Sequence, residues 1–197
     1  DCASFQMLRE LKGKYRHIIV STGATFDYEI EHAASVLDGI QFSFLHCVTV
    51  YPTPLEQLNL ARMDYLRRFT PRVGFSDHSL VSSDGVIASK AALALGAKII
   101  ERHYTVLGPE DTKDGPVSIN PDQLKELAEF ASLSIEQRVL AMDKAVPDWR
   151  IMLGQERRDL THIELLNRDY YRGRFASRRL GQVSRGYLVD NWEEVPL

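Results

Sequence analysis

The 197-residue sequence lacks several features that would assign it to a class of protein directly. Its only cysteines, Cys2 and Cys47, cannot build a disulfide framework, so we predict a reducing, cytoplasmic location. No apolar run approaches the roughly 18 residues that a membrane span needs, and we expect no membrane partner. The 24 Lys and Arg against 27 Asp and Glu leave no basic excess, which argues against a nucleic-acid partner.

Short apolar runs alternate with helical patterns over the first three quarters of the chain. Each run suits a strand buried on both faces, and the runs occupy residues 17–23, 42–49, 72–78 and 98–104. Apolar residues recur at helical spacing over 30–37, 58–69 and 82–95, and another helix opens at Asn120-Pro121. The alternation predicts an α/β fold with four parallel strands joined by right-handed crossovers.

This rhythm stops near residue 145, which predicts a division between residues 1–145 and an extension over 146–197. The extension contains both tryptophans, Trp149 and Trp192, and no lysine. Its acidic and basic side chains nearly balance, so it is not a polybasic tail. The sequence assigns no role to the extension.

Ligand chemistry in parallel sheets sits at the carboxyl ends of the strands, and this rule selects two histidines. His78 and His103 end consecutive predicted strands, so their imidazoles can converge on one ion. Two neutral imidazoles with open positions suit Mn, Fe, Co or Zn. The alternative is that each ring only bonds a backbone carbonyl at the end of its strand. Glu101, on the same strand face as His103, and Asp77 are further candidates to bind or support the metal.

Hydroxyl groups and loops at the same edge are further candidates. Ser21 and Ser76 stand where side chains and backbone amides hold phosphate or carboxylate oxygens, although both also suit ordinary turns. Segment 51–54 is either a ligand-facing loop or a helix start, and loop 108–118 is either functional or merely solvated. His46, inside an apolar strand, is predicted to be a hydrogen-bonded core residue.

Taken in order, five segments resemble the sialic acid synthase (N-acetylneuraminate synthase) family. They read IVSTG (19–23), LHC (45–47), YPTP (51–54), GFSDHS (74–79) and IERHYT (100–105). Asp114, with Ser118 and Pro121, is a weaker match. The resemblance extends from residue 1 to about residue 142.

This resemblance implies a (β/α)8 barrel and a transferase reaction. Phosphoenolpyruvate would condense with an N-acyl hexosamine or a related hexose, releasing phosphate and forming a sialic-type (nonulosonic) 2-keto-3-deoxy sugar acid. A divalent metal, usually Mn²⁺, would bind His78 and His103, and Ser21 and Ser76 would hold phosphoenolpyruvate.

The resemblance also assigns roles to three further residues. Tyr51 and Asp114 would contact the sugar. Asp1 matches an acidic residue that precedes a cysteine in the family, and its carboxylate could handle the proton of the attacking water. A homodimer is among the assemblies that the resemblance allows.

A (β/α)8 barrel takes about 250 residues, and four strands cannot close one. We therefore expect this chain to hold about the second half of the barrel, as part of a longer enzyme, and to be inactive alone. One alternative is a metal-dependent aldolase or 3-deoxy-keto-acid synthase with another acceptor. The other is a non-catalytic family member that acts as a binding or scaffold module.

Overall fold

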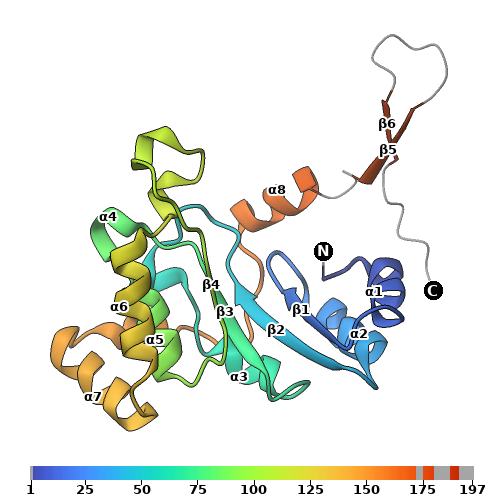
Figure 1. The fold of residues 1–197 in the computed structure, drawn as a ribbon. Coiled ribbons are helices and arrows are strands. Elements are labelled where there is room, and N and C mark those ends of the chain that lie inside the picture. The colour runs from blue at the N-terminus through green and yellow to red at the C-terminus, as the bar shows by residue number, and fades with distance from the viewer. Residues whose placement is uncertain (1, 172–174, 180–186, 191–197) are drawn as a thin grey trace.

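The computed structural model describes residues 2–171, 175–179 and 187–190 and shows an α/β fold (Figure 1). Four parallel strands form one curled sheet, in the order β1 (His17–Ser21), β2 (Gln41–Cys47), β3 (Val73–Asp77) and β4 (Ile100–Arg102). The register places Cys47 beside Ser76 and Asp77 beside Arg102. All four carboxyl ends therefore meet at one edge of the sheet, as the sequence predicts.

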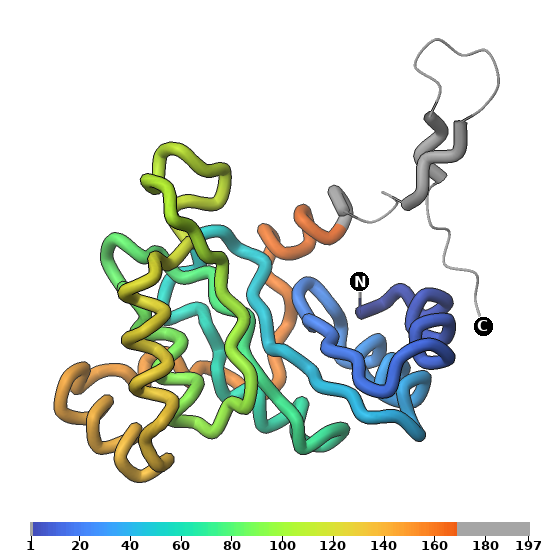
Figure 2. The backbone as a smooth tube through the Cα atoms, viewed as in Figure 1, coloured from blue at the N-terminus to red at the C-terminus, as the bar shows by residue number. Residues whose placement is uncertain are grey.

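Most of the helices connect or cover these strands, and Figure 2 shows the path of the chain from one to the next. They are α1 (Phe5–Lys12), α2 (Asp27–Leu37), α3 (Arg62–Arg67), α4 (Val81–Asp84), α5 (Ile87–Ala94), α6 (Pro121–Ala131) and α7 (Ile135–Ala145). The 3₁₀ turns are η1 (Leu55–Gln57), η2 (Pro109–Asp111), η3 (Gly115–Val117) and η4 (Trp149–Met152). Helix α6 begins where predicted, because the Asn120 side chain accepts a hydrogen bond from the Gln123 N–H at 2.9 Å.

The core lies between the sheet and its helices. Phe44 on β2, Phe75 on β3 and Ile30 on α2 are fully buried, and removing each such side chain from water stabilises the fold by about 1.5–3 kcal/mol. The sheet is tightest at Gly74, where a Cβ atom would lie 2.3 Å from the Ile99 carbonyl oxygen. Only glycine therefore allows β3 and β4 to pair this closely.

Two predicted helices are interrupted. The helix predicted over 58–69 is shortened to α3, which begins only at Arg62, because Asn59 adopts a left-handed conformation with φ of +49°. The Leu60 and Ala61 N–H groups then donate to the carbonyls of Met152 and Leu153, both at 2.9 Å. A contact from the far end of the chain thus replaces helical hydrogen bonds.

The second interruption divides the predicted 82–95 helix. Gly85, with φ of +54°, separates α4 from α5. The predicted strand over 98–104 is also shorter than expected, and β4 ends at Arg102. Beyond it, Tyr104 forms an isolated bridge to Ile119 instead of continuing the ladder with β3.

The extension begins against the same core. Trp149 and Met152 of η4 are buried in it, and α8 (His162–Tyr171) follows. Strands β5 (Phe175–Arg179) and β6 (Tyr187–Asp190) form a separate antiparallel pair. Within the residues that the structure describes, no helix combines the length and apolar character that crossing a membrane requires.

His46 is the buried core histidine that the sequence predicts. Its Nε2–H group donates to the Leu58 carbonyl at 2.6 Å, and the side chain is 1% exposed. Burial lowers the pKa of His46 to about 3 and that of His78 to about 4. Both rings are therefore neutral in the folded chain over most of the range in which an exposed histidine titrates.

We expect the free energy of unfolding to fall as the pH drops from about 6.5 to about 4. Over this window the unfolded chain binds protons at His46 and His78, whereas the folded chain does not. Each histidine therefore lowers the free energy of unfolding by up to about 1.4 kcal/mol per pH unit. Urea unfolding at stepped pH values measures the slope. The variant His46→Gln, whose amide can still donate to Leu58, should give a shallower slope, and an unchanged slope would contradict the assignment.

Candidate functional site

A cavity of about 270 Å³ opens at the carboxyl ends of the strands. It is lined by Ser21, Gly23, Cys47, Thr49, Tyr51, Ser76, His78, Glu101 and His103. Six of the predicted site residues are in this set: Ser21, Tyr51, Ser76, His78, Glu101 and His103. Residues up to 82 positions apart in the sequence (103 − 21) are thus brought together by the parallel topology.

The two histidines lie side by side. The His78 and His103 ring centroids are 5.4 Å apart, with the ring planes at 60°. His78 Nδ1 is 3.8 Å from Cys47 Sγ, and the His78 carbonyl accepts a hydrogen bond from Thr53 N–H at 2.9 Å. The lowered pKa of His78 arises first from burial and then from the neighbouring His103, so its ring offers an unprotonated nitrogen at neutral pH.

Tyr51 and Asp114 approach the histidines from two loops. The Tyr51 ring centroid is 4.1 Å from that of His78, and the tyrosine is 51% exposed. Asp114, at the start of η3, has Oδ2 3.8 Å from His103 Nδ1 but does not line the cavity. Asp1 lies outside the described residues, so its predicted position has no counterpart here.

The two acidic candidates beside the histidines behave differently. Glu101 lines the cavity, and its Oε1 accepts a hydrogen bond from the buried Ser76 hydroxyl at 2.6 Å. Asp77 faces the other side of β3, because successive strand residues point in opposite directions. Its carboxylate accepts from Ser79 N–H at 2.9 Å and forms a buried ion pair with Arg102. Asp77 is therefore not among the residues that line the cavity, and its predicted role of binding or supporting a metal stays a prediction.

Sequence reasoning gave no functional role to two residues of the cavity, Cys47 and Thr49. Burial raises the pKa of the Cys47 thiol to about 11, which keeps it protonated at neutral pH. The Thr49 hydroxyl is buried without a hydrogen-bond partner among the described residues. Because Thr49 lines the cavity, this hydroxyl could form a hydrogen bond with a ligand there. A Cβ atom at Gly23 would lie 2.7 Å from Thr49 Cγ2, which shows how closely the two loops pack. The predicted strand over 42–49 included Thr49, whereas β2 ends at Cys47 and Thr49 lies in the loop that follows it.

The donor set fits a divalent transition metal only as an open site. Within the described part of the chain, no three His, Cys, Asp or Glu side chains are grouped to hold an ion between them. His78 and His103 offer two imidazole nitrogens, and Glu101 adds a carboxylate to the same cavity. Such a pair suits a metal that completes its coordination with water or substrate oxygens.

Several curated proteins are similar in sequence to this chain. N,N'-diacetyllegionaminic acid synthase of Campylobacter jejuni is 38% identical over 133 residues, which are 64% of this chain and 39% of that protein. Spore coat polysaccharide biosynthesis protein SpsE of Bacillus subtilis is 33% identical over 154 residues, which are 77% of this chain and 40% of that protein. The chain thus spans about 40% of the length of these curated relatives.

A solved structure shows the same likeness in three dimensions. The N-acetylneuraminic acid (sialic acid) synthetase of Leptospira borgpetersenii, crystallised with citrate, aligns with a TM-score of 0.62 at 27% identity. The alignment covers 87% of this chain and 54% of that one. The NeuB family matches residues 1–140, the region that carries all four strands of the sheet and the whole cavity. Sequence motifs, fold and relatives agree, and the chain belongs to the NeuB family.

Proposed function

We propose that this chain supplies the metal-binding, carboxyl-terminal half of a (β/α)8 barrel that condenses phosphoenolpyruvate with an N-acyl hexosamine or related hexose. The product is a sialic-type 2-keto-3-deoxy sugar acid, and phosphate is released. The observation that carries this proposal is the pairing of His78 with His103 in one cavity that also holds Ser21, Ser76 and Glu101. Two of the similar proteins described above are named as a legionaminic acid synthase and a sialic acid synthetase.

The charges in the cavity suggest where each substrate sits. Ser76 already donates its hydroxyl proton to Glu101, so it can donate to phosphoenolpyruvate only after rotating away. The Glu101 carboxylate would repel the phosphate and carboxylate groups of that substrate. We therefore place its anionic groups near Ser21 and the unpartnered Thr49 hydroxyl, on the β1 and β2 side of the cavity.

The sugar would occupy the side of the cavity nearer the histidines. Tyr51, beside His78, offers a ring face and a hydroxyl to the sugar, and Asp114, beside His103, offers a carboxylate. A divalent ion, Mn²⁺ in this proposal, would be held by His78 and His103 and would polarise the aldehyde of the sugar. Asp1 is the proposed acceptor of the proton from the water that adds to the donor carbon.

The barrel itself requires partners for both edges of the sheet. In the described residues β1 pairs only with β2, and β4 pairs only with β3. Ile19, on the edge strand β1, is 51% exposed, which is unusual for an apolar strand residue of a parallel sheet. The remaining strands of a closed barrel would cover this side chain and satisfy the unpaired backbone groups.

Phosphate release tests the proposed reaction. The longest natural form of the protein that contains this chain is incubated with phosphoenolpyruvate and a panel of N-acyl hexosamines and plain hexoses, with and without Mn²⁺. We expect release only when an acceptor and the metal are both present. Release without metal would refute the mechanism, and no release with any acceptor would support a binding or scaffold role. Condensation with a donor other than phosphoenolpyruvate would indicate an aldolase.

A further inference from the structure

Helix α8 directs two charged side chains into the protein and apolar ones outward. Glu164 and Arg168 are buried, whereas Ile163 and Leu166 are 53% and 54% exposed. A surface helix of a globular protein usually shows the opposite arrangement. The docking of α8 therefore depends on specific polar contacts, and these contacts lead to the cavity.

Arg168 contacts the loop that follows β1. Its Nη1 donates to the Ala24 carbonyl at 2.7 Å and to Glu29 Oε2 at 2.8 Å, and its Nη2 pairs with Glu29 Oε1. Glu29 in turn accepts from the Phe26 N–H at 2.9 Å. Ala24 has φ of +47°, a left-handed conformation that residues other than glycine rarely adopt. Such a conformation persists where surrounding contacts fix it, and here Arg168 makes one of those contacts.

Asn167 contacts the loop that follows β2. Its Nδ2 donates to the Thr49 carbonyl at 2.5 Å, and Thr49 lines the cavity together with Gly23. One turn of α8 therefore contacts both loops that form the β1 and β2 side of the site (Figure 1).

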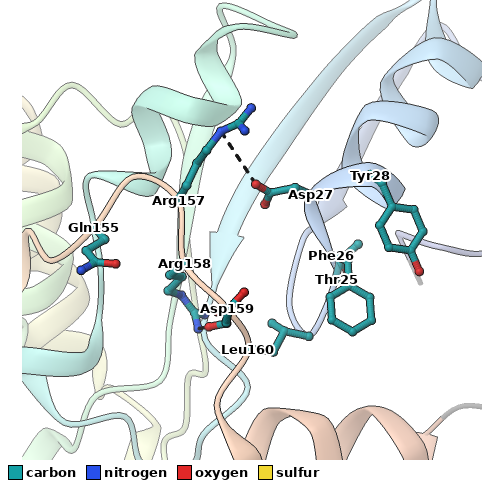
Figure 3. Close-up of a pocket in the computed structure, with 9 residues that line it drawn as sticks. All are labelled: Thr25, Phe26, Asp27, Tyr28, Gln155, Arg157, Arg158, Asp159 and Leu160. Atoms are coloured by element: carbon teal, nitrogen blue, oxygen red, sulfur yellow. Dashed lines mark hydrogen bonds and ion pairs between the residues drawn. The ribbon is translucent and has the colours of Figure 1, made fainter.

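Contacts other than those of Asn167 and Arg168 hold the start of α8 in place. Arg158 donates two hydrogen bonds to Glu164, at 2.6 and 2.7 Å, and Thr161 N–H donates to the same carboxylate at 2.9 Å. Figure 3 shows the segment from Gln155 to Leu160 passing beside the start of α2, with Arg157 directed at Asp27 across a cavity of about 370 Å³. Loss of one contact at Asn167 or Arg168 thus leaves α8 attached.

We propose that α8 is a positioning element of the site, in which Arg168 orders loop 22–26 and Asn167 orders loop 48–51. Both residues lie beyond residue 140, where the match to the NeuB family ends. The consequence for catalysis rests on the proposed function, but the ordering of the loops does not.

Hydrogen–deuterium exchange of the full chain tests the two contacts separately. Asn167→Ala should speed amide exchange in loop 48–51 by about tenfold and leave loop 22–26 unchanged. Arg168→Lys keeps the charge but cannot bridge Glu29 and Ala24 with a planar fork, so it should speed exchange in loop 22–26 and leave loop 48–51 unchanged. The control is Arg150→Lys, which alters an exposed ion pair with Asp143.

The split between the loops is the decisive result. A helix that only docks would loosen both loops equally in either variant, and that outcome would overturn the proposal. Unchanged exchange in both variants would overturn it as well. Exchange does not depend on turnover, so a failure of the proposed reaction leaves this result interpretable.

Discussion

Replacing either His78 or His103 by alanine should lower the affinity of the protein for Mn²⁺ by at least about 100-fold. The two rings are the only imidazoles that line the cavity, with centroids 5.4 Å apart, and each would supply one nitrogen ligand. Glu101 could add a carboxylate but no second nitrogen, so each variant would lose one of the two imidazole ligands. Titration calorimetry with Mn²⁺ alone measures the change, on protein whose near-ultraviolet circular dichroism matches the wild type.

His162→Ala is the matched control for this experiment. His162 is exposed at the start of α8 and does not line the cavity. Its removal should leave the Mn²⁺ affinity unchanged. If both cavity variants bind Mn²⁺ as tightly as the wild type, the histidine pair is not a metal site, and the proposed reaction loses the ion that would polarise the aldehyde.

Asp77→Ala should lower the free energy of unfolding by about 3–5 kcal/mol. The Asp77 and Arg102 side chains are 0% and 3% exposed, so the variant leaves a guanidinium buried without its counter-ion. Arg102 would keep hydrogen bonds to the Ser79 hydroxyl and carbonyl, at 2.9 and 2.8 Å, but these carry no compensating charge. Urea unfolding monitored by circular dichroism measures the loss.

An exposed ion pair gives the comparison. Asp64→Ala breaks a pair with Arg67 whose side chains are 65% and 32% exposed, and it should change stability by no more than about 1 kcal/mol. The double variant Asp77→Leu, Arg102→Met removes both buried charges and should recover much of the lost stability. Equal effects of Asp77→Ala and Asp64→Ala would show that the buried pair is not a main support of the strand ends.

Periodicity was sufficient to predict the sheet and the edge that carries the site. Parallel strands in sequence order leave few arrangements, so four apolar runs predicted which ends meet. Alternation along β4 also placed Glu101 on the same face as His103, and both line the cavity. These successes depend on local patterns that repeat every two or four residues.

What the sequence did not reveal depends on contacts between distant segments. Asn59 ends a helical pattern because the backbone next to it pairs with residues 152 and 153, over 90 positions away (152 − 60 = 92). The helix α8 was missed for a related reason. Its buried face carries Glu164, Asn167 and Arg168, so a search for an apolar stripe finds nothing to place against the core.

The alternation of β3 separates two kinds of selection during evolution. Ser76 and His78 face the cavity, while Phe75 and Asp77 face the packed interior. Substitutions at Ser76 or His78 would change groups that a ligand in the cavity meets, whereas substitutions at Phe75 or Asp77 would change packing and charge pairing in the interior. Neighbouring positions of one strand can therefore be changed for binding or for stability independently, because their side chains point to opposite faces.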